Sequence, residues 1–193
     1  MKTLGMFLAL SMVVTLPLSA QDSFPRAEVF AGYSFLHDGV TGQNLNGWGA
    51  SLSGSLTKHL GATADFSGAY GSVPYQYVCT LPVPPGCPAP PQVLNDYHFL
   101  AGPRFTLRTP KVTPFAEALF GIANLRRQDL GSRTSFAMGF GGGVDIALKR
   151  HFAYRLIQVD YIPTKRPATG TGGGWDSEVR IQTGLVLRFG KGK

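Results

Sequence analysis

Charged and apolar residues alternate along several stretches of the sequence. In SEVRIQTGLVLRF, Glu178, Arg180 and Arg188 fall on even positions, whereas the large apolar residues fall on odd ones. Side chains of an extended strand point alternately to its two faces, so these charges share one face. Enclosed charges persist only when they are paired and hydrogen-bonded, and we therefore predict an ion-pair network. Its expected members are Glu28, Asp65, Arg104, Glu117, Asp145, Arg155, Asp160, Glu178, Arg180 and Arg188.

Two of these residues, Arg155 and Asp160 in RLIQVDY, occupy positions of opposite parity. Both can face the same side only if a β-bulge adds one residue to the strand. We predict this bulge between Leu156 and Val159. In a regular strand, Arg155 would instead extend toward the edge of the apolar layer.

The polar face also allows two other functions. Its charges could be the selectivity lining of a small pore. His98 with Asp96 and a loop serine is the only candidate catalytic group for a lipid hydrolase or acyltransferase. A lone inward histidine is far more often a hydrogen-bonded structural residue, so we expect no enzymatic activity. The histidines lack zinc-site spacing, and the glycine-rich GTGGGW and GFGGGVD lack the GK[ST] of a phosphate loop. No metal or cofactor is expected.

Eight stretches in which apolar and small or polar residues alternate must position these side chains. No helical periodicity of similar length is present. Each spans roughly the nine to eleven residues that a tilted strand needs to cross a bilayer. Their connections alternate between short (TKH, TPKVT and KRH) and longer, as in outer-membrane barrels. The stretches are 27–36, 46–56, 60–70, 96–108, 114–124, 135–148, 152–161 and 178–189.

The side that faces inward cannot be read from alternation alone, because a soluble lipocalin-like barrel also alternates. One face carries bulky residues such as Trp48, Leu52, Phe105 and Ile181, and the other carries glycine, serine and the charges. Side chains just fill the interior of an eight-stranded barrel, so the small face fits inside. We predict an all-β fold, an eight-stranded antiparallel up-and-down transmembrane β-barrel with its bulky face toward lipid.

Aromatic residues near the strand ends predict two interfacial girdles, although β-propensity alone explains any single one about equally well. The girdle near the long connections comprises Tyr33, Phe35, Trp48, Tyr70, Tyr97 and Tyr161, and the opposite girdle comprises Phe105, Tyr154 and Phe189.

The N-terminal twenty residues predict export. They combine Lys2, an apolar run and a small-residue ending at Ala20, which is typical of a secretory signal peptide cleaved before Gln21. Residues 21–193 are expected to form one domain. The net charge of +7 could suggest nucleic acid, but the basic residues are scattered and no binding motif is present.

Cys79 and Cys87 are the only cysteines and lie in a Pro-rich connection. In an exported chain, such a pair predicts a disulfide, with two unlinked thiols as the alternative.

Arg126, Arg127 and Arg133 lie in another connection, LRRQDLGSR. They could pair with lipopolysaccharide phosphates, although ordinary solvated charge is the simpler interpretation.

Segments such as EVFAGYSFL, YHFLAGPRFTLR and GLVLRF make essentially the whole exported chain resemble the small OmpA-type outer-membrane β-barrel family. The resemblance implies a location in the outer membrane, contact with lipid and lipopolysaccharide, and insertion by the barrel assembly machinery. It also implies that Phe189 is the terminal aromatic that this machinery recognises. The expected role is structural or surface-interacting, with a largely filled polar lumen. The alternatives are a narrow porin-like channel and, less favoured, a lipid-modifying enzyme.

Overall fold

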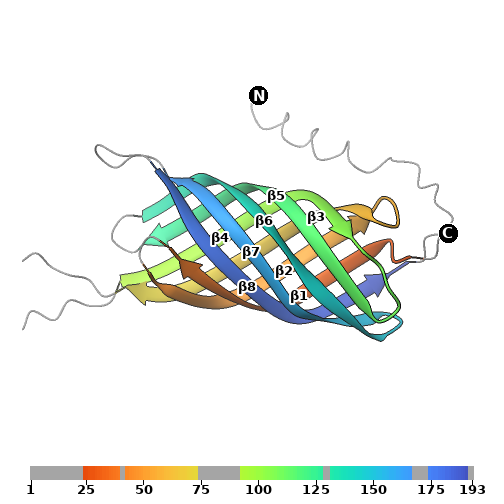
Figure 1. Cartoon of the computed structure of the whole chain (residues 1–193). Coiled ribbons are helices and arrows are strands. Elements are labelled where there is room, and N and C mark those ends of the chain that lie inside the picture. The colour runs from red at the N-terminus through yellow and green to blue at the C-terminus, as the bar shows by residue number, and fades with distance from the viewer. Residues whose placement is uncertain (1–23, 40–41, 74–91, 128–130, 167–173, 191–193) are drawn as a thin grey trace, which may run out of the picture.

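The chain forms one closed barrel, in which each strand is antiparallel to its neighbours (Figure 1). The computed structural model describes residues 24–39, 42–73, 92–127, 131–166 and 174–190. Within these ranges, no helix is long and apolar enough to cross a membrane. The closed, antiparallel arrangement of the strands confirms the predicted fold class. The strands are β1 (Ala27–Asp38), β2 (Asn44–Ser55), β3 (Leu60–Val73), β4 (Gln92–Thr106), β5 (Val112–Arg127), β6 (Gly131–Lys149), β7 (Phe152–Arg166) and β8 (Gly174–Phe189).

Strands β1 and β8 close the barrel, with Ala27 opposite Phe189 and Asp38 opposite Glu178. We call the end that holds Ala27 and Phe189 the turn end, because the β2–β3, β4–β5 and β6–β7 turns also lie there (Figure 1). The opposite end is the loop end. The predicted signal peptide, Cys79 and Cys87 lie outside the described residues.

The strands reach farther toward the loop end than alternation predicts. The ladder between β5 and β6 pairs Leu125 with Arg133 and Arg126 with Ser132, so these arginines are not in a long loop. Several connections are correspondingly shorter than predicted, since β6 begins only four positions after Arg127. Backbone pairing continues there without a bulky apolar face, and periodicity alone cannot detect such a segment.

The bulky face points outward, as predicted. Trp48, Leu52, Phe105 and Ile181 are 44%, 54%, 44% and 38% exposed on the outer wall. The expectation that only small and charged residues fill the interior is wrong, because large apolar side chains also lie inside, where glycine and serine on neighbouring strands leave them room. The largest of these buried apolar residues are Phe30, Leu36, Leu45, Leu100, Phe115, Leu119 and Ile162.

Aromatic residues on the outer wall contact one another near the loop end. The Trp48 indole donates to the Tyr70 hydroxyl at 3.0 Å, and the Tyr70 and Tyr97 rings meet edge to face at 6.0 Å. Tyr33 hydrogen-bonds to Asn46. These residues form a connected part of the predicted girdle on β1–β4.

Strand β7 is irregular where the sequence predicts a bulge. Arg155 pairs with Gly184 and Gln158 with Gln182, so Leu156 and Ile157 together oppose Thr183. Both bulge residues are exposed on the outer wall. The extra residue lets Arg155 and Asp160 share the lumen face despite their opposite parity.

Candidate functional site: the lumen network

The turn end of the lumen is centred on Glu28 of β1. Its carboxylate lies 3.0 Å from Arg108 Nη1 and 3.2 Å from Arg188 Nε, and Arg104 Nη2 lies 3.9 Å away. Arg108 also donates to Ser55 Oγ at 2.7 Å. One acid is therefore surrounded by three arginines at this end.

Asp145 of β6 connects this group to the middle of the barrel. Its carboxylate accepts from Arg155 Nε at 2.9 Å and lies 3.4 Å from Arg104 Nη2. The two guanidinium carbons lie 3.6 Å and 4.5 Å from the centre of the buried Phe115 ring. The ring thus provides cation–π contacts to both arginines.

Gln158, just after the bulge, links two carboxylates in the middle of the lumen. Its amide nitrogen donates to Glu117 at 2.8 Å and to Asp160 at 2.9 Å, while its oxygen accepts from Arg155. Arg180 of β8 then bridges Asp160 and Asp65 at 2.8 Å and 2.6 Å. The contacts run without a break from Arg188 to Arg180.

Two glycines make space for this network. A Cβ at Gly141 of β6 would lie 2.1 Å from Asp160 Oδ1, and one at Gly49 of β2 would lie 2.2 Å from Gln182 Nε2. Both separations are far below van der Waals contact. Asp160 lies opposite Gly141 in the β6–β7 ladder, whereas Gln182 reaches Gly49 from β8, which is separated from β2 by β1.

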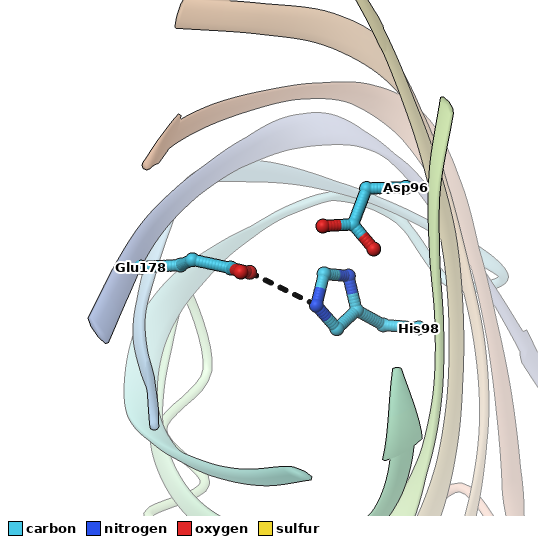
Figure 2. A group of neighbouring side chains, drawn as sticks. All are labelled: Asp96, His98 and Glu178. Carbon is cyan, nitrogen blue, oxygen red and sulfur yellow. Dashed lines mark ion pairs between the residues drawn. The ribbon is translucent and has the colours of Figure 1, made fainter. Parts of the chain in front are cut away.

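A different group of side chains occupies the lumen nearer the loop end (Figure 2). His98 and Asp96 project from β4, and Glu178 extends from β8 on the opposite wall. The His98 Nε2 and Glu178 Oε2 atoms are 3.0 Å apart. All three residues are buried, and one donor atom from each lies within 4.8 Å of the others. We call Asp96, His98 and Glu178 the outer cluster.

Apolar side chains fill the lumen around the outer cluster. Leu94 and Leu100 flank Asp96 and His98 on the inner face of β4. They belong to two aliphatic groups, one with Leu36, Leu45 and Ala69, and the other with Leu119, Ala123, Ala137 and Ile162. The turn end holds a hollow of about 340 Å³ whose lining includes Lys58, Arg108 and Arg188.

All ten charged residues of the predicted network are buried inside the barrel, with exposures from 0% for Asp65 and Asp145 to 9% for Arg188. Phe189 lies on the outer wall and is 50% exposed. Sequence reasoning missed Arg108, Gln158 and the meeting of His98 with Glu178. Parity could have placed Gln158 inside once the bulge was assumed, but no local signal joins residues from opposite walls.

No protein-family model and no curated protein matches this sequence. Solved structures do match its fold. Neisserial surface protein A superposes with a TM-score of 0.57 at 14% identity, covering 88% of this chain and 100% of that chain. Outer membrane protein OprG from Pseudomonas aeruginosa gives a TM-score of 0.55 at 9% identity, covering 87% and 97%. The chain therefore has the eight-stranded antiparallel barrel fold of small OmpA-type outer-membrane proteins.

Proposed function

We propose that the protein is an outer-membrane barrel with a largely filled polar lumen and a structural or surface-interaction role. The apolar outer wall supports the location, because exposed Leu52, Phe120 and Leu185 would be unfavourable in water and favourable against lipid. The turn end would face the periplasm and the loop end the exterior, as in barrels with short periplasmic turns.

The continuous set of ion pairs and hydrogen bonds from Arg188 to Arg180 is the observation that carries the filled-lumen proposal. Moving ions through it would require separating buried partners such as Arg180 and Asp160. Removing one partner of a buried pair typically costs about 3–5 kcal/mol, which would strongly oppose an open state. The aliphatic groups near the loop end would further hinder water and ions.

A narrow channel for ions or small solutes is the second candidate. The hollow of about 340 Å³ at the turn end favours it, since Lys58, Arg108 and Arg188 contribute to its lining and would attract anions. This hollow would have to connect with the exterior through the network and the outer cluster. We therefore place the channel second.

Conductance across a planar bilayer separates the two candidates. Refolded protein, checked by its resistance to SDS until heated, is expected to give no reproducible openings. Regular openings that change with Arg104→Ser or Asp65→Asn would support the channel and overturn the filled lumen. Arg133→Ser, at an exposed strand end, is the matched control.

Lipopolysaccharide is the proposed surface partner. Arg126 and Arg133 are exposed near the loop end, where guanidinium groups could pair with its phosphates. Joint substitution of both arginines by alanine should reduce lipopolysaccharide retention on native gels. Lys111→Ala, in a turn at the opposite end, should leave it unchanged, and equal retention by both variants would remove this partner.

We also propose that Phe189 is read by the barrel assembly machinery, which its exposed position on the last strand supports. Phe189→Ala should slow membrane insertion while leaving unaided refolding in detergent intact. The absence of enzymatic activity is likewise a proposal. It is supported by the deep burial of His98, 1% exposed, since a lipid ester would have to reach it through packed side chains.

A further inference from the structure

We propose that Asp96, His98 and Glu178 bind one divalent first-row transition-metal ion, with Zn²⁺ as the best match. Residue spacing does not predict this site, because the ligands come from β4 and β8, which are neither consecutive in the chain nor neighbours in the sheet. The closed barrel brings them together across the lumen (Figure 2).

The spacing of the donor atoms suits a small ion. Zinc bonds to nitrogen and carboxylate oxygen at about 2.0–2.2 Å, which puts neighbouring ligand atoms roughly 3–4 Å apart. His98 Nε2 and Glu178 Oε2 are already 3.0 Å apart, and one possible ligand atom from each of the three residues lies within 4.8 Å of the others. Figure 2 shows the Asp96 carboxylate beside the other ring nitrogen of His98, so the side chains would have to reorient to bring three protein ligands onto one ion.

The relation between His98 and Glu178 is a second, independent indication. Although Nε2 and Oε2 are within ion-pair distance, His98 Nε2 makes no hydrogen bond of acceptable geometry. His98 is only 1% exposed, so bulk water cannot form a hydrogen bond with this nitrogen. An ion coordinated by both atoms would satisfy it without requiring a linear N–H···O arrangement.

Three buried carboxylates, Asp38, Asp96 and Glu178, lie in or beside the outer cluster. Asp38, which is buried, lies directly opposite Glu178 in the β1–β8 ladder, and like charges in such positions repel each other. Arg180, two residues from Glu178, directs its guanidinium to Asp65 and Asp160. A bound divalent ion would place positive charge among these carboxylates. Unlike a protonated imidazole, it would not lose that charge by deprotonation.

The donor set indicates the class of metal. Imidazole suits zinc and neighbouring transition metals, whereas calcium and magnesium prefer oxygen ligands. Calcium also needs about six to eight oxygens, more than this group offers. The flanking Leu94 and Leu100 would limit water access, which strengthens electrostatic attraction at the site.

Zinc titration of the untagged, refolded full chain tests the proposal. After treatment with a chelator, isothermal titration with ZnCl₂ is expected to show one saturable site per chain. Glu178→Gln and His98→Asn should each weaken binding at least tenfold, while His37→Asn and His151→Asn, which alter exposed histidines, should not. Only protein that shifts on SDS gels after heating is analysed.

Cobalt provides a second measurement, because a histidine with a purely structural role would give no cobalt absorption spectrum. Co²⁺ should give visible d–d absorption bands that disappear in Glu178→Gln, and millimolar Mg²⁺ or Ca²⁺ should not remove them. No saturable zinc binding, or equal binding by wild type and folded Glu178→Gln, would overturn the proposal. Displacement of cobalt by calcium would overturn the assignment to a transition metal. If His98→Asn does not fold, the near-isosteric Glu178→Gln decides the outcome.

Discussion

Two regions of one lumen hold their buried charges in different ways. From Glu28 to Arg180, arginines alternate with carboxylates, and Gln158 links neighbouring pairs. In the outer cluster, two carboxylates meet a histidine instead. Arginine keeps its charge at all ordinary pH values and offers five donors. The ion pairs of the first region therefore persist across that pH range. The His98 imidazole of the second region, in contrast, is positively charged only when it is protonated.

Burial alone therefore does not define the role of an ionisable residue. Asp160 and Glu178 are both 1% exposed, yet Asp160 is held by a guanidinium while Glu178 faces an imidazole. We therefore expect substitutions in the arginine network to reduce stability sharply. Substitutions in the outer cluster should mainly alter metal binding.

The largest expected effect follows from removing the arginine that joins two acids. Arg180→Ala leaves Asp65 and Asp160 without their shared cation, and should lower the free energy of unfolding by about 3–5 kcal/mol. Urea titration of the protein folded in lipid vesicles measures this change. Arg133→Ala removes an exposed arginine and should change the value by less than about 0.5 kcal/mol. Similar losses of unfolding free energy in both variants would show that the buried ion pairs of Arg180 do not stabilise the barrel.

A smaller loss should follow from filling the space that Asp160 occupies. In Gly141→Ala, the new methyl group would clash with the Asp160 carboxylate and with the Val159 backbone carbonyl, and we expect a cost of about 1–3 kcal/mol. Gly54→Ala is the matched control, because a Cβ there meets nothing within 4 Å. The same urea titration applies, and equal midpoints for the two alanine variants would show that the network tolerates displacement.

The smallest effect is expected in the outer cluster. Glu178→Gln loses the contact with His98 but also relieves repulsion from Asp96 and Asp38, so the two contributions have opposite signs. In metal-free buffer we expect a change in stability of less than about 1 kcal/mol. A loss as large as that of Arg180→Ala would erase the distinction between the two regions.

Much of this architecture can be predicted from the alternation of apolar and polar residues, because this pattern indicates both where a strand lies and which of its faces points inward. Even the bulge in β7 follows from the parity of Arg155 and Asp160. The extra strand length near Arg126 and Arg133 could not be predicted, since alternation ends before the ladder does. Neither could the outer cluster, because the distance between His98 and Glu178 depends on barrel closure and side-chain direction.

Both regions require that bulky side chains face lipid while paired charges fill the lumen. Trp48 reports on it directly once Trp175→Phe removes the only other tryptophan. In vesicles containing brominated phospholipid, we expect strong quenching of Trp48 fluorescence and little quenching by aqueous acrylamide. Strong quenching by acrylamide with no effect of brominated lipid would show that Trp48 and its face of the barrel do not contact lipid.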